Sequence, residues 1–137
     1  MKLLMFRVLE FSYRTHVRNL DTEPEREESG GMPDGGLLVW VQVEPADLGR
    51  RVEVVRKAIK NIKWLARRHE VERITIHSFA HLATERAEPE EARPILAEIE
   101  ARLASVGFEV DTTPWGYFNA FTMHVDGPGL AKVFADI

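Results

Sequence analysis

The sequence predicts a single-domain α/β protein in which helices pack on one mixed β-sheet. Its 137 residues fit one domain, residues 1–137, that can bury a sizeable core without a staple. Apolar runs of strand character alternate with two stretches of helical periodicity, and no internal repeat is present. The expected order is strand, loop, strand, helix, strand, helix, strand, strand, helix.

The first expected strand covers residues 2–13. Its apolar and polar residues alternate only loosely, which indicates burial on both faces. Arg7 and Glu10 interrupt the apolar start and no small-residue cleavage site follows, which argues against a signal peptide. No segment reaches membrane-spanning length, and the lack of cysteine excludes disulfides and suits the cytoplasm.

Residues 19–36 are rich in glycine, proline and acidic side chains, so we expect a flexible loop there. The segment offers too few apolar groups to offset the entropy lost on ordering. Its glycines lack the Gly-Lys-Ser/Thr ending of a phosphate-binding loop.

The run 37–43, Leu-Leu-Val-Trp-Val-Gln-Val, predicts a central strand. The next four residues, Glu-Pro-Ala-Asp, break that strand and can start a helix. A helix over 47–69 follows from an apolar stripe at spacings of three and four, formed by Leu48, Val52, Val55, Ile59, Ile62 and Leu65.

A short strand is expected at 72–77 and a second helix at 88–106, ended by Gly107. Pro94 fits this helix if the regular turns begin near it. The core stripe of the second helix is Ile95, Leu96, Ile99, Leu103 and Val106. Strands at 108–111 and 117–125 and a last helix at 129–136 complete the prediction.

Positive charge is concentrated between residues 50 and 68. This stretch holds eight basic residues and one acid, a net charge of +7 within a chain of net charge −4. Such asymmetry is typical of a polyanion-binding surface, and it is also compatible with a solvated helix face. The candidate residues for binding such a polyanion are Arg56, Lys57, Lys60, Lys63 and Arg67.

Two histidines, His77 and His81, lie four residues apart, but the strand ends near His77, so the spacing does not favour a helical metal pair. Ser78 and His81 lack both a Gly-x-Ser-x-Gly elbow and an evident orienting acid, which disfavours covalent catalysis. We therefore expect neither a metal nor a cofactor.

Strand alternation places Asn119 on the face of Phe121 and Met123, and Phe118 on the opposite face. An amide on an apolar face needs partners. Asn119 is therefore either a strand-end amide bonded to the backbone or a polar group at a pocket mouth.

Two motifs together resemble one family, the archaeal N-terminal editing domain of threonyl-tRNA synthetase, with its D-aminoacyl-tRNA deacylase-like fold. Residues 79–82, Phe-Ala-His-Leu, resemble a signature of that family, and a helix and a Gly-Phe strand start follow as they do there. Residues 114–121, Pro-Trp-Gly-Tyr-Phe-Asn-Ala-Phe, are similar to its Pro-Phe/Trp-Gly-Tyr-x-Lys-x-Phe. With the strand that ends at 43–44, the matches cover residues 37–137 in order.

The resemblance implies a pocket that holds a seryl group mainly through main-chain atoms. The implied substrate-binding residues are Val43, Phe79, Ala80 and His81 on one side, with Tyr117, Phe118, Asn119 and Ala120 on the facing wall. His81 and Asn119 are candidate catalytic residues, although the family is thought to use the terminal 2′-hydroxyl of the tRNA rather than protein side chains.

The chain departs from the family pattern at several positions. Asn119 stands where the family has lysine, and Lys132, expected in the last helix, stands where it has an acid. Arg7 and Leu9 stand where the pattern has His and Asp. A mechanism assisted by the substrate tolerates these changes, and an impaired pocket would also explain them.

The implied function is proofreading hydrolysis of L-seryl-tRNA(Thr) in the cytoplasm. The alternatives are a D-aminoacyl-tRNA deacylase and a non-catalytic tRNA-binding module. The implied partners are serine-charged tRNA(Thr), a second copy of the chain in a homodimer, and other domains of a threonyl-tRNA synthetase, since the last element stops abruptly at Ile137.

Overall fold

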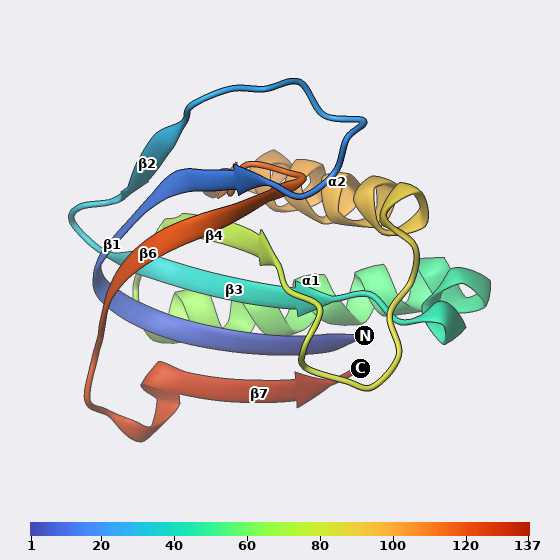
Figure 1. The fold of residues 1–137 in the computed structure, drawn as a ribbon. Helices are drawn as coiled ribbons and strands as arrows, with labels where there is room; N and C mark the ends of the chain where they lie inside the picture. Colours follow the sequence, from blue (N-terminus) through green and yellow to red (C-terminus); the bar gives the residue numbers. More distant parts are fainter.

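A computed structural model describes residues 1–137 and shows one mixed sheet with two helices on one face (Figure 1). The strands are β1 (Lys2–Arg18), β2 (Ser29–Met32), β3 (Gly36–Gln42), β4 (Arg73–Ser78), β5 (Glu109–Thr112), β6 (Tyr117–Val125) and β7 (Lys132–Asp136). The helices are α1 (Arg51–Arg68) and α2 (Pro89–Ser105), with 3-10 turns η1 (Pro45–Arg50) and η2 (Gly129–Ala131). The predicted α/β single-sheet architecture is confirmed.

The long strand β1 organises the sheet. Its first half pairs antiparallel with β3 and β7, and its second half pairs antiparallel with β2 and β6. Register shifts near Val8 and near Thr15 mark irregularities in the pairing with β6. Irregularities of this kind bend a strand and increase its twist. In Figure 1, β1 accordingly curves and runs back over the sheet.

Strands β3, β4 and β5 are parallel neighbours, joined through α1 and α2. Both crossover helices cover the same face, where the main core of 22 buried residues lies. Along β3, Leu37, Val39 and Val41 point into this core. Leu38 belongs to a smaller core on the other face, under the returning half of β1 and β6.

The first helix begins later than the sequence predicted. A 3-10 turn occupies 45–50, and regular α-helix starts at Arg51. Leu48 and Val52, which were predicted to be core residues, are exposed, and 79% of the surface of Val52 is accessible to solvent. The apolar stripe that packs on the sheet starts at Val54, because η1 turns the chain before the helix begins.

Two further predictions about the N-terminal half need correction. The first strand continues to Arg18 rather than ending near residue 13, because β6 pairs with its whole second half. Within the predicted loop 19–36, residues 29–32 form β2, which pairs with Phe11–Arg14 of β1.

The predicted helix at 129–136 is wrong. Only a short 3-10 turn forms, and residues 132–136 then form β7 along the first half of β1. Val133 and Ala135 alternate toward the main core, while Lys132 and Asp136 are exposed. This period of two is a strand pattern, and the free edge of β1 supplies its hydrogen-bonding partner.

The second helix, α2, starts at Pro89 and contains Pro94 in its interior rather than at its start. Because Pro94 lacks an N–H, the helix loses one bond there and keeps the rest. Val106, predicted as a core residue, is half exposed after the helix end.

Candidate functional site

Four of the predicted pocket residues, Val43, Phe79, Ala80 and His81, lie at one edge of the sheet. Strands β3, β4 and β5 are parallel, so their carboxyl ends lie together. Val43 follows β3, residues 79–81 follow β4, and Thr113 follows β5. In parallel sheets this edge is where ligands usually bind, because the loops that leave it are free of the ladder.

The two sequence motifs meet at His77. Its Nδ1 and the Thr113 hydroxyl are 2.8 Å apart and share a hydrogen bond. The imidazole ring lies 4.8 Å from the ring of Phe121, edge to face. Because β1 carries β6 back over the sheet, a residue of the second motif covers the end of β4.

An aromatic cluster surrounds this histidine on the face opposite the helices. Trp40 stacks against Phe79 at 4.7 Å and lies 5.8 Å from His77. Burial lowers the pKa of His77 from its ordinary 6.5 to about 4, because a buried imidazolium loses its hydration. His77 is therefore neutral at pH 7 and joins the two motifs through packing and one hydrogen bond.

Loop 79–88 is fastened by Gln42, a residue that the sequence analysis did not select. Its side chain is 2% exposed. The amide Nε2 donates to the carbonyls of Ala83 (3.3 Å) and Glu85 (2.8 Å). The amide Oε1 accepts from the N–H groups of Leu82 (2.5 Å) and Ala83 (2.8 Å). All four hydrogen-bonding positions of the amide are used. A polar residue within the apolar run 37–43 was the available signal.

Further backbone bonds hold both ends of the same loop on β3. The N–H of Phe79 donates to the Val41 carbonyl at 3.0 Å, and that of Ala87 to the Val43 carbonyl at 2.9 Å. Between these ties, the N–H groups of Ala80 and His81 donate no hydrogen bond within the protein. The N–H groups of Thr84, Glu85 and Arg86 are unpaired as well, but only those of Ala80 and His81 lie between the tie at Phe79 and the bonds from Leu82 and Ala83 to Gln42. These two adjacent donors therefore belong to a backbone that is fixed on both sides.

The structure places the four predicted wall residues of β6 differently from one another. Asn119 shares the inward face with Phe121, and Phe118 is 56% exposed on the outer face, so the predicted alternation is confirmed. Asn119 Nδ2 donates to the Tyr117 carbonyl at 3.3 Å. Its Oδ1 is buried without a partner, as is Nε1 of Trp40. Ala120 is partly buried.

Tyr117 holds the segment that follows β1. Its hydroxyl donates to the Pro24 carbonyl at 2.6 Å and accepts from the Arg26 N–H at 2.8 Å. Glu23 is 8% exposed and pairs with Arg93 of α2 at 2.5 Å and with Arg26 at 3.2 Å. Polar contacts therefore hold this predicted loop in place, and the prediction of flexibility, which counted only apolar groups, did not include them.

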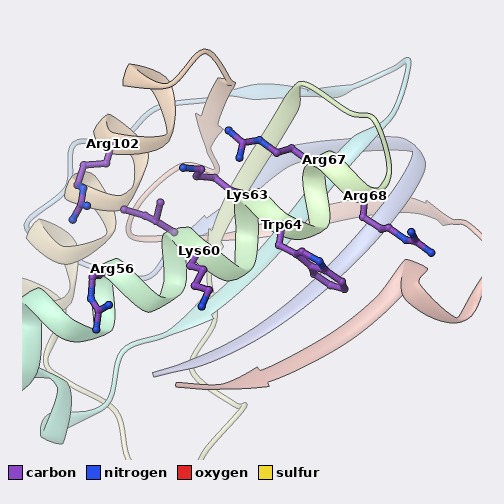
Figure 2. A pocket seen from close by; sticks show the side chains of 8 residues that line it. Arg56, Lys60, Lys63, Trp64, Arg67, Arg68 and Arg102 are labelled. Atoms are coloured by element: carbon purple, nitrogen blue, oxygen red, sulfur yellow. The ribbon is translucent and has the colours of Figure 1, made fainter.

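The predicted basic surface lies on the other side of the sheet, on the helices. Four of its five residues line a groove of about 680 Å³, namely Arg56, Lys60, Lys63 and Arg67. Trp64, Arg68 and Arg102 line the same groove (Figure 2). Lys57 lies outside it and pairs with Glu53 at 2.7 Å. The groove and the carboxyl edge are separate sites.

No group of three or more His, Asp or Glu side chains is placed to hold a metal ion. His77 lies in β4 and His81 in the loop after it, and their rings lie 6.0 and 5.4 Å from the ring of Phe79. Ser78 and His81 are both exposed, and no hydrogen bond joins them. None of the helices is both long and apolar enough to cross a membrane.

Comparison with known proteins identifies relatives over the whole chain. The family model of the archaea-specific editing domain of threonyl-tRNA synthetase matches residues 1–137. The threonine–tRNA ligase of Thermococcus kodakarensis is 39% identical over 107 residues, 78% of this chain and 17% of that protein. The ligase of Thermococcus gammatolerans is 35% identical over 135 residues, 97% of this chain and 22% of that protein. The ligase of Hyperthermus butylicus is 33% identical over 141 residues, with the same two coverages.

The chain thus spans about a fifth of the length of these curated relatives. Among solved structures, the c-Myc DNA unwinding element binding protein superposes with a TM-score of 0.65 at 14% identity. The superposition covers 100% of this chain and 99% of that one. At this identity the likeness concerns the fold alone, and it confirms the predicted D-aminoacyl-tRNA deacylase-like architecture.

Proposed function

The chain belongs to the family of archaea-specific editing domains of threonyl-tRNA synthetase, and on that premise we propose that it removes serine wrongly attached to tRNA(Thr). The observation that carries the proposal is the pair of unpaired N–H groups at Ala80 and His81. They lie at the carboxyl edge of the sheet on a loop that Gln42 fixes. Two fixed donors suit the oxygen atoms of a seryl ester.

Serine and threonine differ by one methyl group, so the aminoacylation site of a synthetase discriminates between them by only about 1–3 kcal/mol of binding free energy. A second pocket corrects the error if it admits serine and collides with the threonine methyl. Main-chain atoms suit this task because they cannot rotate away as a side chain can. The bonds that Gln42 makes give this loop the necessary rigidity.

The proposed reaction is hydrolysis of the aminoacyl ester. The oxygen of a water molecule bonds to the ester carbonyl carbon, the bond from that carbon to the ribose oxygen breaks, and a proton passes from the water to the leaving oxygen. The neighbouring ribose hydroxyl relays this proton. The protein orients the ester and stabilises the developing negative charge on the carbonyl oxygen.

The side chains of the facing wall have secondary roles in this proposal. In the structure Oδ1 of Asn119 is buried without a partner, and a small rotation of the amide would let it accept one neutral hydrogen bond from the seryl hydroxyl. One neutral hydrogen bond is worth about 1 kcal/mol, or roughly fivefold in rate. Asn119 therefore adjusts binding, and the hydrolysis does not depend on a lysine at this position.

The proposed partners follow from the same premise. The substrate is tRNA(Thr) charged with serine, and the remaining domains of a threonyl-tRNA synthetase are the expected neighbours, since this chain covers about a fifth of its relatives. We also propose a homodimer, because open strand edges allow two sheets to pair. Sedimentation at micromolar concentration tests the dimer.

The decisive experiment compares hydrolysis of L-Ser-tRNA(Thr), Thr-tRNA(Thr) and D-Ser-tRNA under single-turnover conditions. We expect rapid loss of L-serine only. Rapid loss of D-serine instead would identify a D-aminoacyl-tRNA deacylase. Binding of the tRNA with no hydrolysis of any ester would refute the enzyme proposal and leave a binding module.

Two substitutions test the main-chain mechanism. Ala80→Pro removes one N–H and is expected to slow L-Ser-tRNA hydrolysis about 100-fold or more, as loss of a fixed donor does elsewhere. Arg86→Pro is the matched control, since the Arg86 N–H is also unpaired but lies beyond the bonds to Gln42. Asn119→Ala is expected to keep the rate within about fivefold. Equal losses in the two proline variants would contradict the assignment.

A further inference from the structure

A groove on α1 and α2 has the composition of an RNA-binding surface. Eight residues line it, and six of them are cationic: Arg56, Lys60, Lys63, Arg67, Arg68 and Arg102. The other two are Ile59 and Trp64, and no carboxylate is among the lining residues. Figure 2 shows these side chains spread along α1, with Arg102 reaching in from α2.

The charges of α1 are sorted by position. Outside the groove, the cations form ion pairs: Arg50 and Lys57 pair with Glu53, and Arg51 pairs with Glu98. Inside the groove, none of the six cations forms an ion pair. A helix face that served only solubility would carry positive and negative side chains interspersed along its length. Six adjacent unpaired cations instead repel one another, and a bound polyanion relieves that repulsion.

An aromatic side chain lies among these cations. Trp64 keeps 52% of its surface exposed and lines the groove. Single exposed apolar side chains are common on protein surfaces, so this ring is informative because it lies among six unpaired cations. Grooves that bind single-stranded nucleic acid combine tracks of positive charge with exposed aromatic rings on which bases stack. Trp64 therefore supplies a ring on which an unpaired base can stack beside a track of positive charge, and this combination favours RNA.

We propose that this groove binds RNA, with phosphates along the cations and an unpaired base stacked on Trp64. The proposal rests on the proposed function, since tRNA is then the RNA that the protein meets. The helices cover the sheet face opposite Trp40 and His77, so the groove cannot hold the nucleotide whose ester is hydrolysed. It anchors another part of the same tRNA.

The groove also has the length of a nucleic-acid track. From Arg56 to Arg67 the helix advances about 16 Å, at 1.5 Å per residue. A second hollow shares Arg68 and continues past His69 to residues 128–130. The path thus runs from α2 along α1 to the turn before β7, long enough for several successive nucleotides.

The test uses the full chain and fluorescence anisotropy with labelled, deacylated tRNA(Thr) and with a decauridylate, across a series of salt concentrations. Lys60→Ala/Lys63→Ala should weaken binding at least tenfold and flatten the salt dependence by about 1.4 in log–log slope. Trp64→Ala should weaken binding roughly 5- to 150-fold and leave the slope unchanged. Arg50→Ala/Lys57→Ala is the matched control, since it also removes two charges, and both lie outside the groove and pair with Glu53.

Three results would overturn the proposal: no binding of either RNA by the wild type, equal weakening by the control and the groove variants, or unchanged binding after Trp64→Ala. If neither RNA binds, an acidic protein surface becomes the alternative occupant. Circular dichroism of each variant separates loss of binding from loss of folding.

Hydrolysis assays separate this inference from the proposed function. Seryl-adenosine is too small to reach the groove, so groove variants should hydrolyse it at the wild-type rate while their KM for Ser-tRNA(Thr) rises and kcat stays constant. If the wild type hydrolyses neither substrate, the proposed function fails, and the anisotropy result still decides the groove. If hydrolysis is normal and KM is unchanged in the variants, the groove proposal fails alone.

Discussion

Replacing Gln42 by alanine is expected to destabilise the protein by about 2–4 kcal/mol. The 2% exposed amide makes four hydrogen bonds, all to main-chain groups of loop 79–88. Each is worth about 0.5–1.5 kcal/mol net, which gives an upper value near 6 kcal/mol. The freed loop groups then turn to water and recover part of this loss, because the loop lies at the surface.

Urea denaturation followed by tryptophan fluorescence measures the loss. Because small domains have stabilities of about 5–15 kcal/mol, the change is large enough to resolve. A second readout is the Tm, which should fall by roughly 6–15 °C for a domain of this size. Asn61→Ala is the control, since the Asn61 amide makes a single hydrogen bond, to the Lys57 carbonyl at 2.9 Å.

The same substitution should slow hydrolysis of Ser-tRNA(Thr), because the N–H groups of Ala80 and His81 lose their fixed positions. Gln42→Glu separates the two kinds of bond, because the carboxylate keeps both acceptor positions but loses the donors to the Ala83 and Glu85 carbonyls. A loss below about 0.5 kcal/mol, equal to that of Asn61→Ala, would refute the idea that Gln42 fastens the loop.

Three further predictions concern other parts of the site. The pKa of His77 is lowered from 6.5 to about 4, so between these pH values the unfolded chain binds a proton that the folded chain does not. The free energy of unfolding should therefore rise by up to about 3 kcal/mol from pH 4 to 6.5. Urea titrations of His77→Gln should show most of this pH dependence removed. Glu23→Ala removes the carboxylate that pairs with Arg26 and Arg93, so it should lower the free energy of unfolding by about 1–3 kcal/mol and speed tryptic cleavage of loop 20–28. Because the side chain of Glu25 is 84% exposed, Glu25→Ala should change neither the stability nor the cleavage rate. Gly116 has φ +77° and a Cβ there would lie 2.6 Å from Cγ of Glu23, so Gly116→Ala should lower stability by at least about 1–2 kcal/mol, and an unchanged Tm would contradict this.

Local periodicity predicted most elements correctly. The alternation along 117–125 gave β6 with its two faces, and the apolar stripe from Val55 to Leu65 gave the buried side of α1. These patterns succeed because side-chain spacing within one element decides which face is buried. The same reasoning failed at 129–136, because the five residues 132–136 are too few to separate a helix from a strand without knowing that β1 offers a free edge.

The candidate site divides in the same way. The motifs around His81 and Asn119 are visible in the sequence because they are contiguous. Their meeting at His77 is not, because it needs the bend of β1 to return β6 over the end of β4. The ties between Gln42 and residues 82–85 span about 40 positions and are likewise invisible to local patterns.

The sequence by itself determined the fold class, the position of the basic stretch and the two motifs that identify the family. Only the tertiary structure decided that the basic stretch lies on the helix side of the sheet, opposite the face of Trp40 and His77, with its paired charges outside a groove and its unpaired charges inside. The physical reason is that composition and periodicity act between near neighbours, whereas ion pairing and the closure of a sheet depend on which distant segments the fold brings together.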